Sequence, residues 1–194
     1  MKKSRIFVIV SGLLVVVVIA GLGVFFWLNN NHKPMLDRSE KTVVMGYGSW
    51  PLYTFEEGVD KAAVIVYGKA AGRGAVKEHV VGSAGDQTMK EYYQEVSIEP
   101  ITLIKGSAGG NVTYLDFDVE TDTHIYDMEG MDPLEVGKEY VLLLNDRGAP
   151  LSPTMVIPVE NGKLTTSFVP EDREDGQEEM AVEEYLQLLK DAAE

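Results

Sequence analysis

The distribution of apolar positions along the chain predicts a membrane segment, a β-rich middle and a helical end. Ile6 to Leu28 form 23 consecutive uncharged positions, directly preceded by Lys2, Lys3 and Arg5. At about 1.5 Å per residue such a helix spans about 35 Å, enough for a hydrocarbon core of about 30 Å. The pattern predicts a transmembrane helix at residues 6–28, and residues 1–5 are then a short cytoplasmic stub.

A cleaved secretory signal is the alternative interpretation of this segment. Signal peptides typically have about 7–15 apolar residues before a small-residue cleavage site. Here the apolar run is longer and ends in the bulky residues 25–28. This favours an uncleaved anchor. The basic residues before the run favour a cytoplasmic N-terminus, so the C-terminal domain is expected on the outer side of a single-pass cell-membrane anchor.

The residues after the anchor predict a stalk and then the start of a folded domain. Residues 29–50 are polar or irregular, and we expect a stalk or linker there. Thr54 followed by Glu57 matches a capping box, which predicts a short helix from Phe55 to about Lys61. The apolar run at 62–67 predicts a buried first strand. The glycine and polar residues at 72–90 predict a long loop.

Alternating polarity predicts strands from residue 91 onward. Residues 91–105 alternate with a shift of parity at Glu99-Pro100, which predicts one long strand with a bulge at that point. In residues 114–120 we expect the apolar Leu115, Phe117 and Val119 to point inward and the intervening Tyr114 and acidic residues to point outward.

Three further elements complete the predicted domain. Residues 140–144 are uninterruptedly apolar and predict a central strand. Residues 155–159 and 163–168 predict a hairpin, because a turn-type Asn-Gly lies between them. Residues 169–194 predict an acidic linker and a C-terminal amphipathic helix from Gln177 to Ala193. That helix either packs on the domain or binds a partner.

Five to six strands, the second long and bent, predict a mainly β domain at residues 51–168 that forms a small closed or nearly closed barrel. Segments 60–69, 92–106 and 133–144 resemble exported Gram-positive bacterial proteins of mostly unknown function. Those proteins are similar in turn to the OB-fold module of netrin and tissue-metalloproteinase-inhibitor type. The resemblance covers roughly residues 54–168 and implies an OB-like barrel.

The resemblance does not carry the inhibitor mechanism. In those inhibitors an N-terminal cysteine places its amine and carbonyl on the protease zinc. This chain has no Cys. It therefore has no such zinc-binding group and no disulfides, although the expected compartment is oxidising.

Charge excludes one class of partner. Residues 35–194 carry 13 basic and 31 acidic side chains, a net charge of −18. Binding to nucleic acid needs a basic footprint, and this domain has the opposite. We therefore expect no nucleic-acid partner.

Acidic side chains at alternating positions suggest a candidate metal site. From Asp118, acids fall at the first, third, fifth and twelfth places of a calcium-binding loop of the EF-hand type: Asp118, Glu120, Asp122 and Glu129. Oxygen ligands of this kind suit Ca²⁺. However, Thr123 stands where that loop needs glycine. The outward, solvated face of a strand explains the first four acids of the segment without a metal, and this is the favoured interpretation.

The sequence offers little catalytic chemistry. The three histidines, His32, His79 and His124, have no pairing at the spacing of a zinc site. The leading prediction is a membrane-anchored extracytoplasmic module that binds a protein or cell-envelope component without catalysis. A Ca²⁺-binding surface module and a hydrolase with an unrecognised site are the alternatives. The candidate contact residues are aromatic: Trp50, Tyr53, Tyr92, Tyr93, Tyr114 and Tyr126.

Overall fold

The structure is a computed structural model, and it describes residues 37–46, 50–84, 87–107, 109–171, 173 and 178–194. The predicted transmembrane helix at 6–28 lies outside these residues, as does the first part of the expected stalk. Within the described ranges, no helix is both long and apolar enough to cross a membrane. The chain divides into residues 1–41 and residues 42–194. The described part of the first unit contains one short 3₁₀ helix, η1 (Arg38–Glu40).

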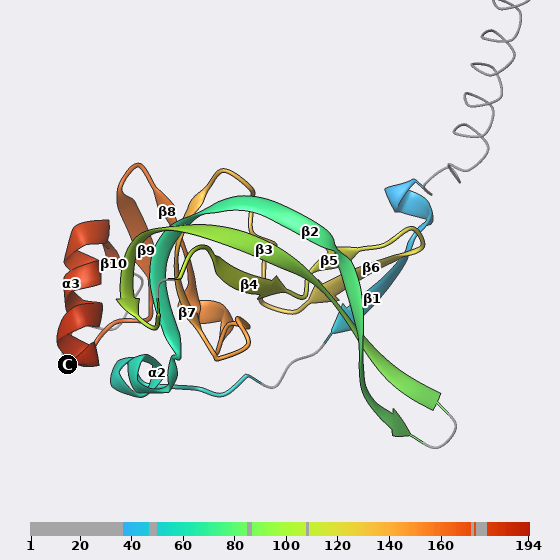
Figure 1. Cartoon of the computed structure of the whole chain (residues 1–194), viewed down its shortest axis with the longest axis horizontal. Helices are drawn as coiled ribbons and strands as arrows, with labels where there is room; N and C mark the ends of the chain where they lie inside the picture. The colour runs from blue at the N-terminus through green and yellow to red at the C-terminus, as the bar shows by residue number, and fades with distance from the viewer. Residues whose placement is uncertain (1–36, 47–49, 85–86, 108, 172, 174–177) are drawn as a thin grey trace, which may run out of the picture. The chain divides into compact units, whose positions relative to one another are not determined.

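The second unit contains two β-sheets (Figure 1). The larger sheet has seven antiparallel strands in the order β10-β9-β8-β7-β2-β3-β4. Their bounds are β2 (Val64–Ala84), β3 (Gln87–Lys105), β4 (Val112–Asp116), β7 (Glu139–Leu144), β8 (Val156–Glu160), β9 (Lys163–Thr166) and β10 (Glu178–Ala181). The mainly β fold class is therefore confirmed.

The smaller sheet has three strands in the order β1-β6-β5. β1 (Thr42–Gly46) runs parallel to β6 (His124–Met128), and β5 (Val119–Glu120) runs antiparallel to β6. β1 lies within the segment expected to be a stalk, so the folded part of the chain begins before residue 51. The sequence pattern does not predict β6, because the five residues of this strand do not alternate between apolar and polar.

Neither sheet closes on itself among the described residues. The seven-stranded order ends at β10 and at β4, so the sheet is open, and the expected closed barrel of five or six strands is not found. The additional strand β10 accounts for part of the difference between the five or six strands expected and the seven strands of the larger sheet. Residues 178–181 pair with β9 instead of forming the first turn of the C-terminal helix, which begins at Val182.

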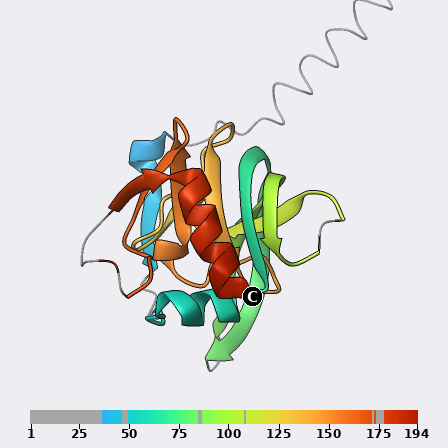
Figure 2. The ribbon, with the colours of Figure 1, turned by 90° about the vertical axis from the view of Figure 1, so that its left-hand side faces the viewer.

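Two helices cover one face of the larger sheet (Figure 2). α2 (Phe55–Lys61) begins at the predicted capping box, in which Thr54 Oγ1 accepts from the Glu57 backbone N–H at 3.2 Å and the Glu57 carboxylate accepts from the Thr54 N–H at 3.1 Å. α3 (Val182–Ala193) buries Tyr185 and Leu189 completely. The C-terminal helix therefore packs on the domain, as the first of its two interpretations predicted.

The central strand β7 separates two hydrophobic cores because its side chains alternate between the sheet faces. Val141 and Leu143 contribute to the core under α2 and α3, whereas Leu142 and Leu144 contribute to the core on the other face. The second core also contains Tyr114 and Leu134. It fixes the segment that precedes β7 against the sheet.

The hairpin of β2 and β3 is the largest difference from the expected secondary structure. The predicted loop at 72–90 is wrong, because β2 continues to residue 84 and β3 begins at residue 87. The outer half of this hairpin extends past the larger sheet and runs beside the smaller one (Figure 1). We call this outer half, residues 72–94, the arm.

Other predicted elements are confirmed in detail. β8 and β9 are joined by Asn161 and Gly162, both with positive φ (53° and 75°), as a type I′ hairpin turn requires. The bulge predicted at Glu99-Pro100 is present, since Tyr67 pairs with Thr102 and Gly68 with Pro100. The extra residue is Ile101, which is exposed.

Candidate functional site

The acidic segment that suggested a calcium site forms the short strands β5 and β6 and the turns around them. Asp118 lies between β4 and β5 and is half-buried, whereas Glu120, Asp122 and Glu129 are exposed. Across the described ranges, no group of three or more His, Asp or Glu side chains is placed to hold a metal ion. The structure thus does not gather these four residues around one point, and calcium binding stays a prediction.

Asp116 has a different position from the one the sequence suggested. The expected parity of residues 114–120 is wrong in β4, where Tyr114 and Asp116 are completely buried and Leu115 is half-buried. The alternation was ambiguous because both faces of this strand carry apolar residues. The prediction placed Leu115 and Phe117 on the inward face, although Val112 and Tyr114 on the opposite face form an equally apolar set.

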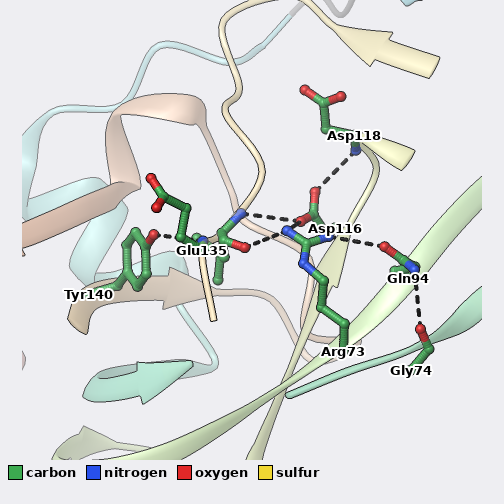
Figure 3. Close-up of polar contacts among 8 residues, drawn as sticks. Arg73, Gly74, Gln94, Asp116, Asp118, Glu135 and Tyr140 are labelled. Atoms are coloured by element: carbon green, nitrogen blue, oxygen red, sulfur yellow. Dashed lines mark hydrogen bonds and ion pairs between the residues drawn. The ribbon is translucent and has the colours of Figure 1, made fainter. Parts of the chain in front are cut away.

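The buried carboxylate of Asp116 is fully engaged (Figure 3). It accepts hydrogen bonds from the backbone N–H groups of Asp118 at 3.1 Å and Leu134 at 3.3 Å. Arg73 in β2 forms an ion pair with it at 2.7 Å. The same guanidinium donates to the Leu134 carbonyl and, at 3.0 Å, to Gln94 Oε1 in β3. One ion pair thus joins the base of the arm, β4 and the segment before β7.

The electrostatics of this cluster are those of a structural contact. Burial raises the pKa of Asp116, and the Arg73 guanidinium opposes this shift. The pKa of Asp118 is raised to about 6, first by burial and then by the negative charges of Asp127, Asp116 and Asp132. Both Asp116 oxygens are occupied by fixed donors, so this carboxylate acts as a structural contact.

The aromatic candidates divide into packed and surface residues. Tyr114 is completely buried, which contradicts its assignment as a surface contact, and Tyr53 packs against the core under α2. Trp50 packs against the second core. Tyr93 lies near Phe117, with ring centroids 6.4 Å apart, along the edge of a separate, more polar hollow.

The half-buried Tyr92 and Tyr126 form an aromatic contact between the arm and the smaller sheet. Their rings stack with centroids 4.6 Å apart and an interplanar angle of 23°. His124 also stacks with Tyr126, with ring centroids 5.9 Å apart. The Tyr92 hydroxyl donates to Glu78 at 3.0 Å, and this hydrogen bond is the main reason why the pKa of Tyr92 is raised to about 12. The stack therefore holds the arm beside β6.

A groove of about 270 Å³ lies against this stack. We call it the tyrosine groove. Its lining comes from four strands and the segment after β4: Val44 and Gly46 in β1, Val81 in β2, Lys90, Glu91 and Tyr92 in β3, Phe117, and Tyr126, Asp127 and Met128 in β6. The sequence pattern indicates its two tyrosines as candidate contacts but does not place them together, because β1, the arm and β6 are far apart along the chain.

Large apolar side chains are exposed around this groove. Val44 in β1 and Val81 on the arm line the groove and are 38% and 51% exposed, whereas Val43 and Met45 alternate to the other face of β1. Two separate elements therefore contribute apolar surface to one place. Apolar residues scattered singly need no explanation, but a contiguous group marks an interaction site.

Comparison with known proteins finds neither a family model nor a curated sequence that matches this chain.

Proposed function

We propose that this protein is a membrane-anchored, extracytoplasmic binding module without catalytic activity, and that the tyrosine groove binds a basic partner protein. The observation that carries the proposal is the apolar surface shared by β1 and the arm around the stacked Tyr92 and Tyr126. Aromatic residues in a partly apolar groove are typical of the centre of protein interfaces.

The size and charge of the groove favour a protein over a small molecule. Its volume of about 270 Å³ is below the range of about 300–1,000 Å³ that is usual for small-molecule sites. Glu91 and Asp127 line it, and residues 35–194 have a net charge of −18. A partner with basic side chains is attracted to such a surface, whereas an acidic partner is repelled.

The absence of catalysis is supported by how the reactive side chains of the described residues are used. His124 stacks on Tyr126 and shares a hydrogen bond with Thr123, and His79 is exposed on the arm. The buried Asp116 is paired with Arg73. A hydrolase needs a nucleophile next to a free base, and none of these groups supplies that arrangement.

The anchor is proposed from the uncharged run at residues 6–28 and the basic residues before it. It is tested by washing membranes that contain the full chain with alkaline carbonate and by adding protease to intact cells. We expect the full chain to stay in the washed membranes and its domain to be cut by external protease. Extraction by carbonate, or a domain protected in intact cells, would contradict the proposal.

The groove is tested by site-specific photo-crosslinking in cells of the source organism. A photoreactive residue replaces Val81, which lines the groove, or Thr165, an exposed residue of β9 on another part of the surface. We expect a protein adduct from position 81 and none from position 165, and free Lys-rich peptide added in excess should reduce the adduct. Equal labelling at both positions would show that the groove has no partner.

A further inference from the structure

The tyrosine groove lies beside a sheet edge that has no strand on its outer side in the described part of the chain. We infer that the partner supplies an extended basic segment that adds to β1 as a fourth strand of the smaller sheet. This inference rests on the proposed function and specifies the form of the partner. Strand addition of this kind obtains its affinity from backbone hydrogen bonds and its specificity from alternate side chains.

The backbone of β1 leaves two residues available for such pairing. The Thr42 N–H donates to the Thr123 carbonyl and the Gly46 carbonyl accepts from the Glu129 N–H, so residues 42, 44 and 46 direct their backbone groups toward β6. Since N–H and C=O groups of successive strand residues point to opposite edges, Val43 and Met45 direct theirs away from β6. These are the groups that an added strand would pair with.

The composition of β1 is unusual for an unprotected edge. Natural proteins usually blunt an edge strand with a charged residue, a proline or a bulge. β1 has the sequence Thr-Val-Val-Met-Gly, without charge or proline, and its register with β6 is continuous over residues 42–46. Val43, Val44 and Met45 are all exposed by more than a third. An edge of this kind is built to be covered by another strand.

The surrounding charges decide which strand would cover it. An added strand would place every second side chain next to the groove, beside Glu91 and Asp127. Lys90 also lines the groove, but its ammonium is held by Glu78 at 2.9 Å. Basic side chains are therefore favoured at these positions. A second copy of this chain would bring another domain of charge −18 to the same edge, so self-pairing through β1 is disfavoured.

The test uses the full chain in detergent and two synthetic libraries of extended peptides of about six residues, the usual length of a strand. One library alternates Lys or Arg with Val, Ile or Thr, and the other has Glu in place of the basic residues. Binding is measured by fluorescence anisotropy, and amide hydrogen exchange reports on Val43 and Met45. Two variants are compared, Met45→Pro, which removes the outward N–H while leaving the pairing with β6, and Met45→Thr, which keeps that N–H.

We expect the basic library to bind both the unchanged chain and the Met45→Thr variant. Binding should protect the amides of residues 43 and 45 from exchange. The Met45→Pro variant should bind the library about tenfold more weakly, or weaker still. Equal binding to both variants would overturn strand addition but leave the groove as a binding site, because crosslinking at position 81 tests the groove independently. Equal binding of the acidic library, no binding, edge amides that are protected before peptide is added, or dimers formed through β1 would each overturn the inference as well.

Discussion

At the scale of single residues, the ion pair of Arg73 and Asp116 is the contact most sensitive to substitution. Asp116 is completely buried, and Arg73 supplies the positive charge closest to it. Removing one partner of a buried pair leaves an uncompensated charge, which typically costs about 3–5 kcal/mol. Because two backbone N–H groups still stabilise Asp116, the lower end of that range applies.

We therefore expect Arg73→Met to lower the free energy of unfolding by about 3 kcal/mol, measured by chemical unfolding of the full chain in detergent. The matched control is Lys77→Met, which breaks the exposed ion pair with Glu95 on the same hairpin. Exposed pairs are worth less than about 1 kcal/mol. Similar losses in the two variants would show that the Arg73 pair has no special role.

The raised pKa of Asp118 leads to a second prediction, which concerns the pH dependence of stability. Its pKa in the folded state is raised from 3.8 to about 6. A raised carboxyl pKa means that folding favours the protonated form, so this contribution is complete below about pH 4 and is lost as the pH rises through about 6. At neutral pH the charged Asp118 destabilises the fold.

Replacing Asp118 by Asn should consequently stabilise the fold by about 1 kcal/mol near pH 7.5, after allowance for solvent screening, and have little effect near pH 4. Thermal unfolding at the two pH values measures this difference. Asp122→Asn, an exposed change in the same segment, is the control and should have little effect at either pH. A loss of stability in Asp118→Asn at neutral pH would contradict the assignment.

The residue scale also shows where sequence patterns stop being informative. The capping box of Thr54 and Glu57 and the Asn161-Gly162 turn are short-range signals, and both were predicted correctly. The burial of Asp116 depends on Arg73, which lies 43 positions away along the chain. No local alternation contains that information, since a buried acid and a solvated one occupy the same place in the pattern.

At the scale of elements, the arm shows a related limit. Its glycine-rich sequence predicted a loop, but β2 and β3 pair with each other along their whole length. Ion pairs between the two strands, such as those of Lys77 with Glu95 and of Lys90 with Glu78, take the place of apolar contacts. Cross-strand pairs of opposite charge stabilise a hairpin without burial, so hydrophobic periodicity does not detect it.

The short helix α2 gives the prediction at this scale, because it packs closely against the core. A Cβ at Gly58 would lie 2.5 Å from Phe168 Cζ and would also clash with Met155 Cε. Gly58→Ala normally stabilises a helix by about 1 kcal/mol, but overpacking a core costs about 1–3 kcal/mol. We expect a net loss of about 1–2 kcal/mol in chemical unfolding.

The control for this prediction is Gly72→Ala in β2, where a Cβ would meet nothing within 4 Å. It should change stability by less than about 0.5 kcal/mol. A gain in stability from Gly58→Ala would show that α2 can move away from Phe168 and that helix propensity dominates at this position.

At the scale of the whole molecule, the acidic charge of residues 35–194 sets the response to salt and, under the proposed function, favours a basic partner. A net charge of −18 destabilises the compact state through self-repulsion. Raising NaCl from about 0.01 M to about 0.1 M shortens the screening length from about 30 Å to about 10 Å. We expect this to stabilise the fold by about 1 kcal/mol, which raises Tm by roughly 2–4 °C for a chain of this size.

The same titration separates screening from calcium binding. Screening depends on ionic strength alone, so about 1 mM CaCl₂ and NaCl of equal ionic strength should give the same Tm if no site is present. A larger shift with CaCl₂, together with calorimetric heat that is lost in Asp118→Asn, would favour the alternative of a calcium-binding module. A bound cation near Asp127 would also lower the negative charge beside the tyrosine groove, and it should then weaken the basic peptides. Peptide affinity measured in the two salts therefore tests whether cation binding at the acidic segment changes the affinity of the groove for basic peptides.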